Sequence, residues 1–134
     1  MKEQILDLST EVRSLVNTSR DMWSVSSCGI TGSEKTIECL VHRDAYQMDE
    51  ETIRVLLVGG LSGNQQDVQM ALRFMHLYRK NSKQLHTCSM SLVPSANPAG
   101  TYDSGYPPED GFFNHPTERE KRYLWRWISY YGPD

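Results

Sequence analysis

The stretch VGGLSGNQQD, residues 58–67, holds the residue types and spacing that come nearest to a catalytic motif. An apolar run enters a glycine turn that carries Ser62 and leads into a helical pattern, which is the setting of the nucleophilic serine in α/β-hydrolases. That motif is G-x-S-x-G, and Asn64 stands where its second glycine belongs. Asp103 and His115 follow in the chain order of triad partners, within a turn-rich stretch. A serine hydrolase using Ser62 is one hypothesis, and a turn residue or helix cap is the favoured interpretation of this serine.

A phosphate-binding loop is another hypothesis for the same glycines, because a helix N-terminus offers free backbone N–H groups to an anion. Gly59, Gly60 and Gly63 do not have the G-x-G-x-x-G spacing of dinucleotide sites, and no Gly-Lys-Ser/Thr ending follows. The sequence therefore predicts a tight glycine turn. Solvated carboxylates are expected in the loop further along: Asp103, Glu109 and Asp110.

Two pairs of cysteine and histidine residues have the chemistry of zinc ligands. Cys39 and His42 are three residues apart, which in a strand places them on opposite faces. His86 and Cys88 share a face, but a structural zinc site needs four ligands. We expect buried cysteines, surface histidines and no bound metal. Cys28 and Cys39 flank a turn, and the sequence leaves open whether they form a disulfide.

Bulk properties predict a soluble globular chain without a nucleic-acid or membrane partner. The chain has 134 residues, 38% of them hydrophobic and 23% charged, with a net charge of -3. No apolar run approaches the ~20 residues that span a bilayer. The start, MKEQILDLST, lacks the apolar stretch of a secretory signal. The compartment stays open: cytoplasmic, or secreted or periplasmic if a signal preceded this start.

The elements that must position these residues are predicted from hydrophobic periodicity and turn residues. Apolar residues at helical spacing mark a first helix, Gly32 and Ser33 mark a hairpin turn, and Asp67 suits the first turn of a middle helix. The run IRVLLVGG indicates a strand buried on both faces. The expected order is a helix over 5–16, strands over 23–28, 36–42 and 53–60, a helix with an apolar stripe over 68–78, a strand over 85–94 and a loop over 95–115.

A final helix is expected after a capping box formed by Thr117 and Glu120. The order of elements predicts an α/β fold with a mixed β-sheet flanked by helices. A helix that follows a strand normally returns the chain to the sheet, and this one is followed by no further strand. We therefore expect residues 1–134 to be a single domain that is the N-terminal part of a larger, truncated one. The apolar face of the last helix is predicted to be Leu124, Trp125, Ile128 and Tyr131.

Two segments together resemble the zinc carboxypeptidase family. Members carry a strand that ends in a glycine-rich loop with an H-x-x-E zinc motif, often written GGIHGNE. In GGLSGNQ, Ser62 stands at the position of the first zinc-binding histidine and Gln65 at that of the zinc-binding glutamate. The scaffold positions of that motif are kept: Gly59, Gly60, Gly63 and Asn64.

The second segment, PSANPAG, is similar to the family's Pro-x-x-Asn-Pro-Asp-Gly turn. Ala99 replaces the aspartate, and the other positions match: Pro94, Asn97, Pro98 and Gly100. The tail PTEREKRYLWRWISYYGPD resembles the helix that leads, in this family, toward the strand before the third zinc ligand. That histidine and the catalytic glutamate would lie beyond Asp134. TYDSGYPPEDGFFNHP also contains no arginine where the family binds the substrate carboxylate.

The resemblance implies a retained scaffold and a lost metal site. A hydroxyl and a primary amide are neutral, weak zinc ligands, and without zinc no water of lowered pKa and no Lewis acid is available. We expect a carboxypeptidase-like pseudoenzyme whose cleft, lined by Ser62, Gln65 and the turn at Asn97, binds a peptide or glycopeptide within a larger protein. The remainder of that protein and a second copy of the chain are expected partners. A divergent metallohydrolase completed beyond Asp134 stays the alternative.

Overall fold

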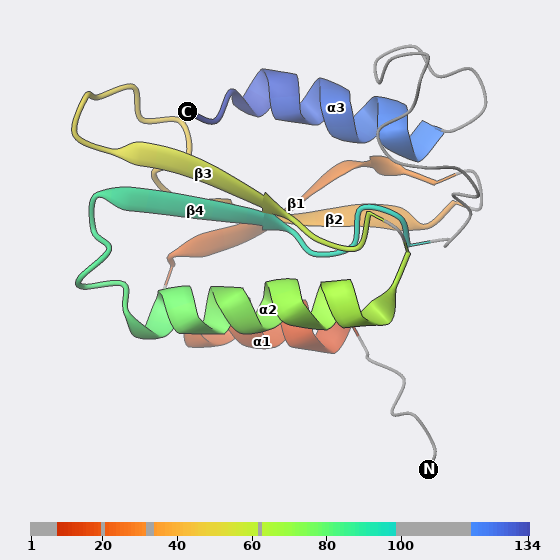
Figure 1. Cartoon of the computed structure of the whole chain (residues 1–134), viewed down its shortest axis with the longest axis horizontal. Coiled ribbons are helices and arrows are strands. Elements are labelled where there is room, and N and C mark those ends of the chain that lie inside the picture. The colour runs from red at the N-terminus through yellow and green to blue at the C-terminus, as the bar shows by residue number, and fades with distance from the viewer. Residues whose placement is uncertain (1–7, 20, 32–33, 62, 99–118) are drawn as a thin grey trace.

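The computed structural model describes residues 8–19, 21–31, 34–61, 63–98 and 119–134. These residues form a mixed four-stranded sheet in the order β1-β2-β4-β3, with α1 and α2 on one face and α3 on the other (Figure 1). This arrangement confirms the predicted α/β class with a mixed sheet. No helix in these ranges is both long and apolar enough to cross a membrane. The elements are α1 Leu8–Thr18, β1 Trp23–Ile30, β2 Thr36–His42, β3 Ile53–Val58, α2 Gln65–Lys80, β4 Cys88–Val93 and α3 Arg119–Tyr131.

Strands β1 and β2 form the predicted antiparallel hairpin, with Trp23 opposite His42. The register shifts between Ser27 and Gly29, so β1 contains a β-bulge and runs two residues past the predicted end. Gly29 has a φ of 156° and lies under α3, where a Cβ atom would come within 2.6 Å of the Cβ of Tyr123. The glycine therefore allows α3 to pack closely on the hairpin.

Strand β4 is central and strand β3 lies at the edge of the sheet. The two run parallel, from Ile53 opposite Cys88 to Val58 opposite Val93, and β2 pairs antiparallel with β4 at Leu92. The prediction that β3 is buried on both faces is wrong: four of its residues are half-buried and Ile53 is exposed. An edge strand has a neighbour on one side only, so its side chains are less covered.

The predicted strand over 85–94 starts too early. Residues 81–87 form turns, in which the N–H of Leu85 donates to the carbonyl of Asn81 and the N–H of Cys88 donates to that of Leu85. These bonds take up the backbone groups that a strand would offer to its neighbour. Strand β4 therefore begins only at Cys88.

The sheet separates two hydrophobic clusters. The predicted stripe of α2 is confirmed, and it packs with α1 against Trp23, Leu40 and Leu92. On the other face, α3 packs Leu124 against buried side chains of the sheet, with Trp127 and Ile128 beside it. Trp127 stacks on Tyr131 with ring centroids 5.3 Å apart, so the sheet-facing side of α3 includes a tryptophan that the predicted face omitted. The proposed capping residue Thr117 lies outside the described residues.

Candidate functional site

The loops after β3 and β4 lie side by side at the carboxyl ends of two parallel strands, the usual place for a ligand site in such sheets. The N–H of Gly59 donates to the carbonyl of Val93 at 2.8 Å, which extends the strand pairing by one step. The N–H of Ala96 then donates to the carbonyl of Gly59 at 2.9 Å, and that of Asn97 to the carbonyl of Gly60 at 3.2 Å. The two family-like segments are therefore joined by backbone hydrogen bonds, and we call this contact between residues 59–60 and 96–97 the joint.

Glycine is required at both positions of this joint. A Cβ atom on Gly59 would lie 2.7 Å from the Cβ of Ala71 in α2 and 2.9 Å from the carbonyl oxygen of Pro94. Gly60 has a φ of +65°, in the left-handed region, and its Cβ would lie 2.8 Å from Cγ2 of Val68. The predicted tight glycine turn is confirmed, and its cause is the close approach of α2 and the second loop.

The start of α2 is capped by a residue of the family-like motif. The side-chain oxygen of Asn64 accepts a hydrogen bond from the N–H of Gln66 at 2.9 Å, as an N-cap does. Asn64 is thus the helix cap, a role that the sequence offered to Ser62. Gln65 is the first residue of the helix and is exposed. Ser62 lies outside the described residues.

Asn97 and Pro98 follow β4 in the second loop. Asn97 is 1% exposed, so its side chain belongs to the support of the loop more than to an open surface. Pro98 is half-buried. Gly63 has a φ of 77° and its N–H donates to the carbonyl of Gly60 at 3.1 Å. Gly100, the last predicted scaffold residue, lies outside the described residues.

The described donor set at this loop does not fit zinc. Zinc sites in proteins are built from imidazole nitrogen, thiolate and carboxylate, and the loop offers the amides of Asn64 and Gln65. The Asn64 oxygen already accepts a backbone hydrogen bond. Across the described ranges, no group of three His, Cys, Asp or Glu side chains is placed to hold a metal ion.

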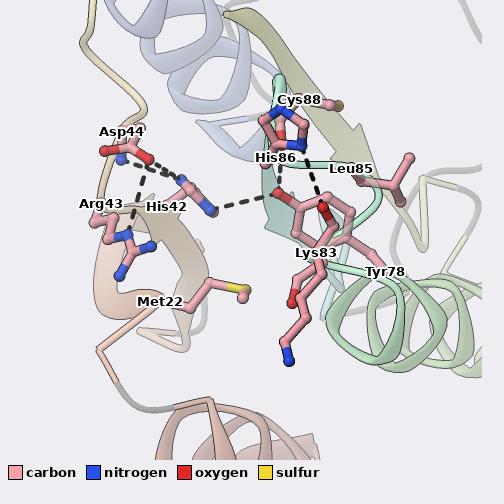
Figure 2. A pocket seen from close by; sticks show the side chains of 10 residues that line it. Met22, His42, Arg43, Asp44, Tyr78, Lys83, Leu85, His86 and Cys88 are labelled. Carbon is pink, nitrogen blue, oxygen red and sulfur yellow. Dashed lines mark hydrogen bonds and ion pairs between the residues drawn. The ribbon is translucent and has the colours of Figure 1, made fainter.

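A second candidate site lies at the opposite end of the sheet, and no motif in the sequence indicated it. A cavity of about 270 Å³ opens between the end of β2, the end of α2 and the start of β4 (Figure 2). Its inner wall is formed by His42 and Tyr78, and Figure 2 shows the two side chains pointing toward each other. The expectation of surface histidines is wrong for His42, which is 7% exposed. Its position two residues after Leu40, a core residue of the same strand face, was the available signal.

A chain of hydrogen bonds fixes the tautomer of His42. The N–H of Asp44 donates to Nδ1 at 3.1 Å, so Nδ1 carries no proton and Nε2 does. Nε2 lies 3.4 Å from the hydroxyl of Tyr78, which itself donates to the carbonyl of Cys88 at 2.5 Å. Burial lowers the pKa of His42, and the Asp44 carboxylate offsets part of that shift. Burial therefore favours the neutral form of this histidine.

The lining of this cavity carries charges of both signs and one thiol. Arg43 and Lys83 both line it (Figure 2), and Nδ1 of His86 lies 3.2 Å from the carbonyl of Lys83. Arg43 is paired with Asp44 at 3.8 Å. Burial raises the pKa of the Cys88 thiol, which keeps it protonated and weakly nucleophilic.

The other two cysteines are core residues. Cys28 and Cys39 are buried free thiols, and burial raises their pKa values to about 12 and about 11. Cys39 lies opposite Ser26 in the hairpin, and Cys28 is the bulged residue, which has no directly opposed partner. Cys39 packs on the α3 face while His42 contacts Tyr78 on the α2 face, which confirms that the two side chains lie on opposite faces of the sheet.

Solved structures that are similar to this chain include metallocarboxypeptidase-like proteins. A metallo-carboxypeptidase from Burkholderia cenocepacia superposes with a TM-score of 0.64 at 12% identity, over 92% of this chain and 38% of that one. A candidate metallopeptidase from Shewanella denitrificans OS217 gives 0.64 at 16% identity, over 92% and 46%. Another, from Shewanella amazonensis SB2B, gives 0.60 at 17% identity, over 92% and 50%. The chain thus spans half or less of the length of these neighbours.

Sequence comparison does not assign the chain to a family. No family model matches the chain, and no curated protein matches it significantly. At identities of 12 to 17%, the likeness to the solved structures is one of fold. The chain therefore has the α/β fold of metallocarboxypeptidase-like proteins over part of their length.

Proposed function

We propose that this chain is a carboxypeptidase-like binding domain in which zinc binding and peptide hydrolysis have been lost. The observation that carries the proposal is the contrast between the two loops' backbone and their side chains. The backbone joint between Gly59–Gly60 and Ala96–Asn97 is intact, whereas Gln65 presents a neutral amide at the family's glutamate position. A dication needs anionic or imidazole donors, so the frame is kept without its metal chemistry.

The proposed ligand is a peptide or glycopeptide bound outside the carboxyl ends of β3 and β4. The support is the position of the joint at the ends of two parallel strands, where the N-terminus of α2 also points. The exposed Gln65 amide offers a donor and an acceptor to a peptide group. Such a domain, within a longer protein, would hold the end of a bound peptide chain in place. Fold alone does not assign this role, so binding must be measured directly.

Zinc content tests the loss of metal binding. The purified chain is incubated with zinc, desalted and measured by elemental mass spectrometry, beside the variant that carries Ser62→His with Gln65→Glu. We expect far less than one zinc per chain for the wild type and a higher content for the variant, which regains imidazole and carboxylate. His86→Ala controls for adventitious zinc on a surface imidazole. One zinc per wild-type chain that is lost in Gln65→Ala would refute the proposal.

Ligand binding and activity are tested on the same protein. N-acetylated tripeptides with a free carboxylate are titrated while backbone amide shifts are followed by NMR. Shifts centred on Gly60, Gln65 and Asn97 are expected, and shifts confined to the cavity at His42 would contradict the assignment of the site. Chelator-sensitive hydrolysis of the same peptides would favour the divergent metallohydrolase. Labelling of Ser62 by a fluorophosphonate would favour a serine hydrolase.

A further inference from the structure

The cavity beside His42 lies next to the two inner strands of the sheet. It is bounded by the end of β2, the end of α2 and the start of β4 (Figure 2). In the strand order β1-β2-β4-β3, both β2 and β4 have a neighbour on each side, so the cavity does not depend on an open sheet edge. Its volume of about 270 Å³ is just below the range of about 300–1,000 Å³ that is usual for ligand pockets, so it suits a compact ligand.

The inner wall of the cavity contains a buried donor that is poorly satisfied. Nδ1 of His42 accepts from the N–H of Asp44, so the proton of the neutral ring is on Nε2. Within the described residues, the acceptor nearest to this proton is the hydroxyl oxygen of Tyr78 at 3.4 Å, which is longer than the usual N–H···O distance of about 2.7–3.2 Å. Because buried donors normally have a well-placed acceptor, this N–H is available to an oxygen atom of a ligand.

The charged side chains around the cavity leave an excess of one positive charge. Arg43, Lys83 and Asp44 line it, together with two imidazoles that are counted as neutral. Asp44 is paired with Arg43 at 3.8 Å, so these two charges offset each other. Lys83 forms no salt bridge with any other residue that the structure describes. The lining therefore matches a ligand with a single negative charge.

Apolar groups form another part of the lining. Met22 is half-buried, Leu85 is 40% exposed, and the half-buried thiol of Cys88 lines the same cavity. A short hydrocarbon chain would be removed from water against these groups, which stabilises its binding in proportion to the apolar area buried. Phosphate has no apolar group to place there. The lining thus favours a ligand that combines one anionic group with a short apolar chain.

We propose that the cavity beside His42 binds a small monocarboxylate with a short apolar chain. One carboxylate oxygen accepts from the Nε2–H of His42, the ammonium group of Lys83 balances the charge, and the chain packs on Met22 and Leu85. Inorganic phosphate shares the negative charge without the chain and is the comparison anion. The inference is independent of the peptide site proposed above, which lies at the other end of the sheet.

NMR titration of the 134-residue chain with sodium butyrate tests the proposal, with sodium chloride adjusted to hold the ionic strength constant. We expect saturable shifts of the His42 Nε2–H signal and of the backbone amides of Arg43 and Lys83, with a dissociation constant in the millimolar range. Butanamide, which has the same chain without the charge, should bind about fivefold more weakly or worse. Inorganic phosphate should also bind more weakly than butyrate. Equal binding of butyrate and butanamide, tighter binding of phosphate, or shifts that rise linearly at every lysine and arginine would overturn the proposal.

Three variants test the assigned contacts. Lys83→Gln should raise the dissociation constant of butyrate about twofold to fivefold, as expected for an exposed ion pair. Lys80→Gln is the matched control, because Lys80 is an exposed lysine at the end of α2 that does not line the cavity, and it should leave the constant unchanged. Leu85→Ser should weaken butyrate and leave the binding of phosphate unchanged. Equal effects of the two lysine variants would overturn the assignment, as would butyrate shifts at the loops after β3 and β4 with none at His42.

Discussion

Substitution of Gly60 by alanine is the sharpest test of the joint between the two loops. The residue has a φ of +65°, and an added Cβ would lie 2.8 Å from Cγ2 of Val68 and 3.1 Å from the Cα of Ser95. Two penalties therefore act together. A non-glycine residue in the left-handed region costs about 1–2 kcal/mol, and overpacking in a tight site costs about 1–3 kcal/mol. Gly60→Ala should lower the free energy of unfolding by about 2–5 kcal/mol.

Gly132→Ala separates the two penalties. Gly132 ends α3 with a φ of +60°, and the nearest atom to its added Cβ, the carbonyl oxygen of Ser129, lies at 3.9 Å. It therefore carries the backbone cost, about 1–2 kcal/mol, without the clash. The lowered entropy of the unfolded chain is common to both alanines and cancels in the difference.

The assay is urea unfolding of both variants and the wild type, followed by tryptophan fluorescence and circular dichroism with a shared m-value. Gly60→Ala should be less stable than Gly132→Ala by about 1–3 kcal/mol. Equal losses within about 0.5 kcal/mol would show that the loops and α2 are not pressed together at Gly60, and the reasoning for the joint would fail.

Two further predictions concern the faces of the sheet. Because burial lowers the pKa of His42 below its ordinary 6.5, the unfolded chain binds the proton first. The contribution of neutral His42 to the free energy of unfolding is therefore complete above that pH and falls as the pH drops below it. His42→Gln should flatten this pH dependence in urea unfolding measured between about pH 7.5 and pH 5. Leu124 is 1% exposed on the sheet-facing side of α3, and Leu124→Ala should lower the free energy of unfolding by about 2–5 kcal/mol, measured by thermal or urea unfolding. Tyr130→Ala, at 80% exposure on the same helix, should cost less than about 0.5 kcal/mol, and equal losses would contradict the packing of α3.

The candidate site was predictable to the extent that it depends on local pattern. The glycines at 59 and 60 and the turn at Asn97 were identified from short motifs, and the structure brings those two segments together. The sequence left Ser62 as a turn residue or a helix cap, and the structure identifies Asn64 as the N-cap of α2, a choice that depends on backbone geometry. His42 was missed as a buried group because burial of a polar side chain depends on a partner, Tyr78, that is remote in sequence.

The sequence by itself determined the kind and order of the elements. The apolar stripe of α2, the branched run of β3 and the hairpin each follow from side-chain periodicity, which is a property of neighbouring residues. The mixed sheet followed from the order of these elements. Gly60 and Gly63 have a left-handed φ, which favours glycine wherever it occurs, whereas Gly59 is required by the close approach of Ala71 in α2.

Only the tertiary structure decided which strand is central and which is at the edge. β3 has the more continuous apolar run, yet β4 lies between β2 and β3 and holds the buried position. The bulge at Cys28 and the burial of His42 likewise depend on what packs beside each strand. The physical reason is that burial and backbone pairing are set by neighbours in space, and periodicity along a strand reports only which residues share a face.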